Sequence, residues 1–115
     1  MINKALTDQE TLVIHPKCPV KKCMDVMGGK WKTTIIYLIS LQINRFGKLQ
    51  RSCEGISKQM LTKQLRELEK DGIITRKIYA EIPPRVEYSV TAKGETLFPI
   101  IKSMQDWGLK HIDEN

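Results

Sequence analysis

Long apolar runs are missing from this 115-residue sequence. The longest, around "IIYLISL" at 35–41, is far below the roughly 20 residues needed to cross a bilayer. The opening stretch "MINKALTDQE" also lacks the apolar segment of a secretory signal. We therefore expect a cytoplasmic protein with no membrane partner, whose length fits one domain with a single modest core.

Cysteine is scarce as well: Cys18, Cys23 and Cys53 are the three present, with no CxxC pair. An odd number without that spacing argues against a disulfide scaffold or a structural zinc site. A glycine-rich phosphate loop, an oxyanion motif and a set of metal ligands are also missing from the sequence. We therefore predict no cofactor, no bound metal and no enzyme activity.

Acidic residues are too few to balance the basic ones, and 19 Lys and Arg against 13 Asp and Glu give a net charge of +6. Residues 17–85 hold 15 basic and 6 acidic residues, a local charge of +9, while residues 1–16 sum to −1 and residues 86–115 to −2. A basic middle between slightly acidic ends favours a module that faces a polyanion. A surface that only keeps the protein in solution is the alternative, and charge alone does not separate the two.

The hydrophobic pattern predicts a mainly α protein with a small β-hairpin. Apolar spacing and flanking breakers predict four helices, at 19–27, 30–42, 46–53 and 57–71. Residues rich in β-branched and aromatic side chains then predict strands on both sides of "AEIPPR". A last helix follows Thr91, and Pro99 predicts a kink or a restart there, because an interior proline costs about 3 kcal/mol. Three helices followed by a hairpin form the winged variant of the helix-turn-helix.

Local signals refine this outline. Residues 3–13 predict a weak helix or arm, and "HPKCP" at 15–19, with its two prolines, predicts an extended segment. The helix at 30–42 should be the most buried. Ser57 is the expected N-cap of the helix at 57–71, and Gly72 its natural stop.

The helix at 57–71 has an exposed face of unusual composition. An advance of 100° per residue places Leu61, Leu65 and Leu68 within about 40° of one another, which defines the buried stripe. Glu67 and Glu69 fall on the flanks. The opposite side carries only neutral polar and basic side chains, namely Gln59, Thr62, Lys63, Arg66 and Lys70.

Such a face suits the phosphate backbone of a DNA duplex, because an acid there would repel it. The first two turns hold side-chain types that read base edges in a major groove: Ser57, Lys58, Gln59, Thr62 and Lys63. At the hairpin tip, "IPPR" places Arg85 behind two prolines, which suits it to a minor groove or its phosphates. A solvated face that happens to lack acids, and a turn with a solvated arginine, are the alternatives.

Six motifs together carry a family resemblance. They are "CPV" (18–20), "GGKWK" (28–32), "RFGKL" (45–49), "GISKQMLTKQLRELEKDGIITR" (55–76), "PPRVEYSVTAKG" (83–94) and "WG" (107–108). With them the chain resembles the HxlR-type winged helix-turn-helix transcriptional regulators, a bacterial group with MarR-like architecture. The motifs span about residues 18 to 108, nearly the whole domain.

The resemblance implies a homodimer that is built through terminal helices and binds double-stranded DNA at a pseudo-palindromic operator. Its recognition helix corresponds to 57–71, and its wing to "PPR". An N-terminal arm or helix at 1–17 would contribute to the dimer, 18–92 would form the DNA-binding core, and 93–115 would form the dimerisation helix. Repression is the expected mode of regulation.

Cys18 matches the cysteine that many members carry before their second helix, which some use to sense oxidants or electrophiles. Some members pair this thiol with a C-terminal cysteine, which this chain lacks after Cys53. A Cys18–Cys18 bond between subunits, a mixed disulfide and alkylation stay open. The residues themselves place Cys18 at the N-cap of a helix, near several lysines, and both features favour the reactive thiolate. An unreactive N-terminal cysteine is the alternative, whereas Cys23 and Cys53 lie on apolar helical faces and are expected in the core.

Two further classes of function compete with a DNA-binding regulator. A thiol enzyme would need a base for Cys18, and His15 and His111 are the only histidines. A winged-helix module that binds another protein without DNA would not require an acid-free outer face on the helix at 57–71. We therefore predict a homodimeric, sequence-specific transcriptional regulator that responds to oxidants or electrophiles through Cys18.

Overall fold

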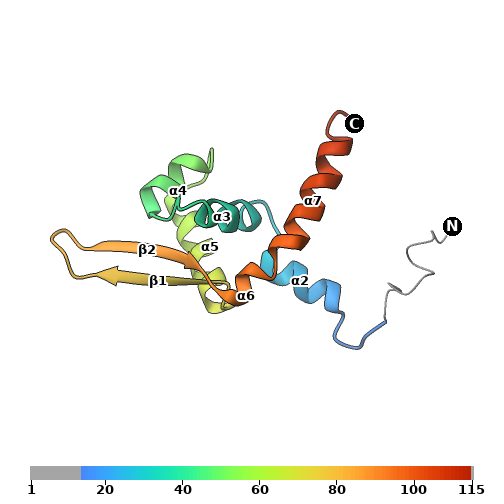
Figure 1. The fold of residues 1–115 in the computed structure, drawn as a ribbon, viewed down its shortest axis with the longest axis horizontal. Coiled ribbons are helices and arrows are strands. Elements are labelled where there is room, and N and C mark those ends of the chain that lie inside the picture. The colour runs from blue at the N-terminus through green and yellow to red at the C-terminus, as the bar shows by residue number, and fades with distance from the viewer. Residues whose placement is uncertain (1–13, 115) are drawn as a thin grey trace.

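The computed structural model describes residues 14–114, so the helix or arm predicted at 3–13 lies outside the described residues. Its elements are α2 Pro19–Met27, α3 Lys32–Ser40, α4 Phe46–Ser52, α5 Lys58–Lys70, β1 Ile74–Tyr79, β2 Arg85–Val90, α6 Ala92–Glu95 and α7 Phe98–His111. The hairpin projects from one end of the central helices, and α7 extends at the other (Figure 1). The predicted mainly α fold with a two-stranded hairpin is confirmed.

The core forms among the central helices. Ile35, Ile36 and Ile39 of α3 are each at most 2% exposed, which confirms the prediction of a deeply buried helix. The leucine stripe of α5 belongs to the same cluster and is buried to the same degree. Because burial of one leucine contributes about 1.5–3 kcal/mol, this stripe decides which side of α5 stays outside. Across the described residues, we find no helix with the length and apolar character that a membrane span requires.

Side-chain caps define where α5 and α6 begin. The Ser57 hydroxyl accepts a hydrogen bond from the Met60 amide at 3.0 Å, which confirms the predicted N-cap. Thr91 caps α6 in the same way, with the Gly94 amide donating at 2.9 Å. At the other end of α5, Gly72 has a φ of 76°, a left-handed conformation that glycine adopts without a steric penalty.

The last predicted helix is divided into two. α6 ends at Glu95, and α7 begins at Phe98 with Pro99 in its first turn. A proline is tolerated there because the first amides of a helix have no partner within it. The restart predicted near Pro99 is confirmed, and α7 then runs away from the core (Figure 1).

The hairpin is antiparallel and is anchored to the helices. In its register, Ile74 lies opposite Val90. Tyr88 is buried, and Val86 and Val90 pack against the core, as the alternation of "VEYSV" predicted. The Tyr88 amide also donates to the Asn44 carbonyl at 3.0 Å, in the connection before α4. The hairpin is therefore joined to the chain that leads into the helix-turn-helix.

Residues 15–18 form a turn, so the extended segment predicted from "HPKCP" is wrong. The Cys18 amide donates to the His15 carbonyl at 2.9 Å, and the Lys17 amide donates to Nδ1 of the same histidine at 2.9 Å. Cys18 has a φ of 46°. These two local hydrogen bonds outweigh the preference for extended backbone that the prolines impose.

One ion pair joins α3 to α5. Lys32 at the start of α3 is 7% exposed, and its Nζ lies 2.7 Å from Oε1 of Glu67. The hydrogen bond from Lys32 holds the pKa of the Glu67 carboxyl below its ordinary value of 4.5, against a smaller opposite effect of burial. The pair connects the buried start of α3 to the edge of the exposed face of α5.

Gly94 occupies a position with no room for a side chain. A Cβ there would overlap the Ile73 carbonyl oxygen and lie 2.7 Å from Cγ1 of Val90. A Cβ on Gly47 in α4 would meet only the Arg51 guanidinium, at 3.4 Å, which is the far end of a flexible side chain. The two glycines therefore provide a matched comparison.

Gly94→Ala is expected to lower the free energy of unfolding by about 1–3 kcal/mol, because the backbone at Ile73 must shift to admit the methyl group. Gly47→Ala should be neutral or stabilise by about 0.5–1 kcal/mol, as alanine does inside a helix. Urea unfolding of both variants beside the wild type measures the difference. Equal stabilities would contradict the packing described for Gly94.

Glu67→Gln is expected to lower the Tm by a few degrees at neutral pH and by less in acid. Because the folded state holds the pKa of Glu67 below its unfolded value, the ionised carboxyl contributes stability above pH 4.5 and loses it as the pH falls through the folded-state pKa. Thermal unfolding across this range tests the sign. Glu54→Gln changes an exposed carboxyl with no ion pair in the described part of the chain, so it should show no such trend.

Candidate nucleic-acid interface

The exposed face of α5 gathers five of the residues predicted to contact DNA. A single shallow hollow on this face is bordered by Lys58, Gln59, Thr62, Lys63, Arg66 and Glu67. Thr62 and Glu67 are partly buried, and the other four side chains are exposed. Since the leucine stripe occupies the opposite side of the helix, these side chains face away from the core.

Two hydroxyl groups at the start of α5 already have backbone partners. The Ser57 oxygen accepts the capping hydrogen bond, and the Thr62 hydroxyl donates to the Lys58 carbonyl at 2.9 Å. Ser57 keeps its proton as a donor, and Thr62 keeps its oxygen lone pairs as acceptors. Both predicted contact residues therefore make hydrogen bonds within the helix and can still form one further hydrogen bond to a ligand.

The two glutamates on the flanks of α5 are ion-paired. Glu67 binds Lys32, and Oε2 of Glu69 lies 3.9 Å from Nε of Arg76 in β1. The sequence placed both acids at the edge of the outer face. The structure adds that Glu67 borders the hollow itself.

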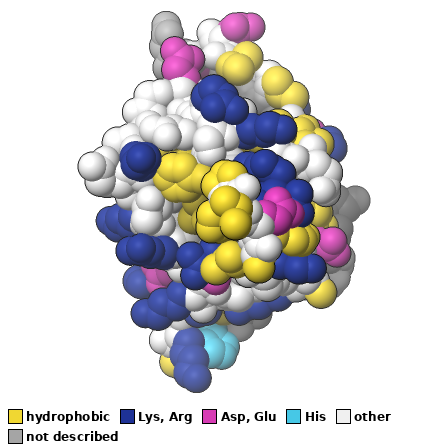
Figure 2. Space-filling view, turned by 90° about the vertical axis from the view of Figure 1, so that its left-hand side faces the viewer, with side chains coloured by type: hydrophobic (Ala, Val, Ile, Leu, Met, Phe, Trp, Pro, Cys, Tyr) yellow, Lys and Arg dark blue, Asp and Glu magenta, His cyan; other side chains and the backbone are white. Residues whose placement is uncertain are grey.

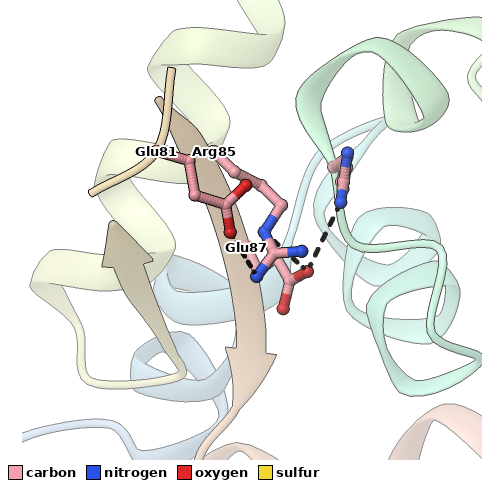
Figure 3. A network of polar contacts seen from close by, with 4 residues as sticks. Glu81, Arg85 and Glu87 are labelled. Carbon is pink, nitrogen blue, oxygen red and sulfur yellow. Dashed lines mark ion pairs between the residues drawn. The ribbon is translucent and has the colours of Figure 1, made fainter. Parts of the chain in front are cut away.

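Arg85, the residue predicted to contact DNA from the hairpin tip, lies beside two glutamates of the hairpin. It is the first residue of β2, and its guanidinium lies 3.2 Å from Glu81 and 3.5 Å from Glu87 (Figure 3). Its Cζ also lies 4.0 Å from the centroid of the Tyr79 ring. The short loop places Glu81, before the prolines, and Glu87, after them, close to the Arg85 guanidinium. Their negative charge holds the Arg85 side chain against the hairpin.

Glu87 also connects the hairpin to the helices. Its carboxylate lies 3.8 Å from the Arg45 guanidinium. Figure 3 shows Glu87 beside Arg85 and Glu81 in the same network. Arg45 occupies the N-cap position of α4. Arg45 was not predicted as a site residue, because no spacing in the sequence signals a contact more than 40 positions away.

The end of the molecule that carries the hairpin is rich in basic side chains. Figure 2 shows Lys and Arg around an apolar patch on this end. Ile78 and Ile82 are exposed apolar residues of the hairpin, and Arg76 and Lys77 are exposed on β1. These two basic residues were not predicted as site residues, although adjacent basic residues in a strand beside the tip could have indicated them.

The three cysteines differ in accessibility. Cys18 is exposed, Cys23 packs against the core, and Cys53 is 2% exposed. Burial raises the pKa of the Cys53 thiol, which disfavours its reactive thiolate. Cys18 occupies the predicted N-cap position of α2, although its side chain makes no capping hydrogen bond. Within residues 14–114 no group of His, Cys, Asp and Glu is placed to hold a metal ion.

The terminal helices expose apolar side chains. α7 contains no buried residue. Its exposed apolar side chains, with that of the residue after it, are Ile100, Met104, Trp107, Leu109 and Ile112. On α2, Val20 and Met24 are 65% and 50% exposed. Monomeric proteins rarely expose large contiguous apolar patches, so these helices are candidates for contact with another chain.

Comparison with known proteins places this geometry in a family. Residues 26–115 match the model of the HxlR-like helix-turn-helix family. The HTH-type transcriptional regulator YdeP of Bacillus subtilis is 47% identical over 96 residues, which cover 84% of this chain and 75% of YdeP. The redox regulator HypR in its oxidized form is similar with a TM-score of 0.75 at 48% identity, covering 81% of this chain and 96% of that one.

The reduced form of HypR gives a TM-score of 0.77 at 47% identity, covering 83% of this chain and 94% of that one. The HTH-type regulators that this chain resembles are not enzymes, so the thiol-enzyme alternative is excluded. The family match covers most of the chain, including α5 and the hairpin. The protein therefore belongs to the HxlR-like helix-turn-helix family of transcriptional regulators.

Proposed function

We propose that the protein is a homodimeric, sequence-specific DNA-binding repressor that places α5 in the major groove. The observation that carries the proposal is the hollow on the exposed face of α5, around which Lys58, Gln59, Lys63 and Arg66 project. Basic side chains neutralise phosphates, while Arg, Lys and Gln make hydrogen bonds to guanine or adenine edges. In such motifs the N-terminal residues of the recognition helix reach the bases.

The terminal helices supply the surface for a second copy. Contact between copies would remove the exposed apolar side chains of α7 and α2 from water, which stabilises by about 25 cal/mol per Å² of apolar area. Segments 1–17 and 93–115 are assigned to the dimer and 18–92 to the DNA-binding core, whose first helix, α2, also meets the second copy. Two-fold symmetry then sets the α5 helices about 34 Å apart, which requires a pseudo-palindromic operator.

The hairpin is proposed to follow the DNA backbone beside the major groove. Lys77 is exposed on β1 and can approach phosphates directly, whereas Arg76, also exposed, must exchange Glu69 for a phosphate. Arg85 must exchange Glu81 and Glu87 for a phosphate before it can do so. Arg85 is therefore proposed to add affinity on every sequence rather than to read bases.

The exposed thiol of Cys18 supports a response to oxidants or electrophiles. HypR is named a redox regulator and has oxidized and reduced structures, and Cys18 lies at the start of α2, beside the proposed dimer surface. Diamide would take two electrons and two protons from the Cys18 thiols of a dimer, leaving an S–S bond between them. An α,β-unsaturated aldehyde would instead be attacked at its β-carbon, so that an S–C bond replaces the C=C π bond and the thiol proton ends on the α-carbon. Either change is proposed to alter the half-site spacing and weaken operator binding.

Gln59→Ala and Lys63→Ala are expected to change the sequence preference of the protein. Each should lose about 1–3 kcal/mol of discrimination at its base pair. Arg85→Ala should weaken binding on all duplexes and flatten its salt dependence, because a phosphate contact is lost. Selection from a random duplex library, followed by titrations at several salt concentrations, measures both effects.

Lys102→Ala supplies the charge-matched control, since it removes a lysine on α7, away from α5 and the hairpin. Because α7 is assigned to the dimer, size-exclusion chromatography checks that this variant keeps the oligomeric state of the wild type. Equal losses from all four variants, with no change of preference, would contradict base reading by α5. Binding that does not depend on salt would instead favour a protein partner for this surface.

Cys18→Ser is expected to keep full operator affinity and to abolish the release of DNA by diamide or an aldehyde, because it removes the accessible sulfur. Cys23→Ser, at a thiol packed against the core, should leave the release intact. A gel-shift titration before and after treatment measures the response. Unchanged release from Cys18→Ser would exclude Cys18 as the sensor.

A further inference from the structure

The glutamates of α5 and of the hairpin have basic partners. Among the described residues of α5 and the hairpin, Glu67 pairs with Lys32, Glu69 with Arg76, and both Glu81 and Glu87 with Arg85. An unpaired carboxylate at this surface would repel phosphates. These ion pairs are therefore expected to affect duplex affinity as well as the stability of the fold.

The pair between Lys32 and Glu67 differs from the others in its geometry. It is the shortest of the four, at 2.7 Å, and its basic member is nearly buried, with 9% of the side chain exposed. The Glu67 side chain is 41% exposed and borders the hollow on α5. The Lys32 ammonium thus cannot reach a phosphate itself, whereas the carboxylate it binds lies where DNA would approach.

The position of Lys32 is unfavourable for a lysine on two grounds. It begins α3, where the helix dipole places partial positive charge, and its N-cap residue Trp31 provides no side-chain cap. Burial of an ammonium group also costs free energy unless a partner compensates it. Glu67 supplies that compensation.

We propose that Lys32 is a positioning residue for DNA binding, which holds the Glu67 carboxylate neutralised and drawn to the α3 side of the hollow. This inference rests on the proposed function of α5. It assigns a role in duplex affinity to a buried residue that contacts no DNA. The basic surface around the hollow then contains a glutamate whose charge no longer repels phosphates.

Single substitutions of the two residues should have different effects, one on duplex affinity and the other on stability. Lys32→Met places an apolar chain of similar length in the buried position and leaves the Glu67 carboxylate free at the hollow. The fold should tolerate this change, while duplex binding should weaken. Glu67→Gln leaves a buried ammonium without its counter-charge, so it should cost stability rather than affinity.

The experiment compares the full-length wild type, Lys32→Met, Glu67→Gln and the double variant for affinity to a library-selected duplex and for Tm. Lys32→Met should bind about tenfold more weakly at low salt, with the deficit shrinking as salt rises, because the free carboxylate is screened. The double variant should recover to within about twofold of the wild type, since both charges are gone. Rescue of this kind separates charge compensation from a merely structural role for Lys32.

Lys102→Met is the matched control, because Lys102 also pairs at 2.7 Å, with Asp106, and lies on α7. It removes the same charge at a site away from α5 and the hairpin. Size-exclusion chromatography checks that the variant keeps the oligomeric state of the wild type, and with that state kept its duplex affinity should change by less than about twofold. Equal losses from Lys32→Met and Lys102→Met, or no recovery in the double variant, would overturn the proposal. A wild type that ignores duplex DNA at low salt would overturn the proposed function as well, which is a distinct result.

Discussion

Burial of the α5 leucine stripe in the same core as the α3 isoleucines is the interaction on which the rest of the structure depends. These apolar side chains leave α5 one stable rotation, because any other would expose leucine and bury lysine. That rotation turns Lys58, Gln59, Lys63 and Arg66 outward around one hollow. The orientation of the candidate interface therefore follows from the core, and the polar side chains need no contact with one another to share a face.

Electrostatics then adjust this surface through contacts between distant segments. Lys32 comes from α3 and Arg45 from the start of α4, yet they bind acids on α5 and on the hairpin. The Tyr88–Asn44 backbone bond adds a further connection between the hairpin and the helices. The wing and the helix-turn-helix are thus held as one unit, which is what a protein needs to meet a groove and its flanking phosphates together.

Local sequence signals were enough to predict the helices, the hairpin and the exposed face of α5. Periodicity identified the leucine stripe, the Ser57 cap followed from hydroxyl capping, and Pro99 indicated the division between α6 and α7. Pairings that depend on tertiary approach could not be predicted. Lys32 and Glu67 are 35 positions apart, and no periodicity reports how the helices that carry them meet. The ion pairs of Arg85 could not be predicted for a similar reason, since the folded hairpin brings two acids close to it.

The most direct test of the central claim is methylation protection of a library-selected duplex, because dimethyl sulfate reports on guanine N7 in the major groove. The account predicts two protected tracts about 10–10.5 base pairs apart, one beneath each α5 helix of a dimer. Binding without major-groove protection, or protection of a single tract by a monomer, would contradict it.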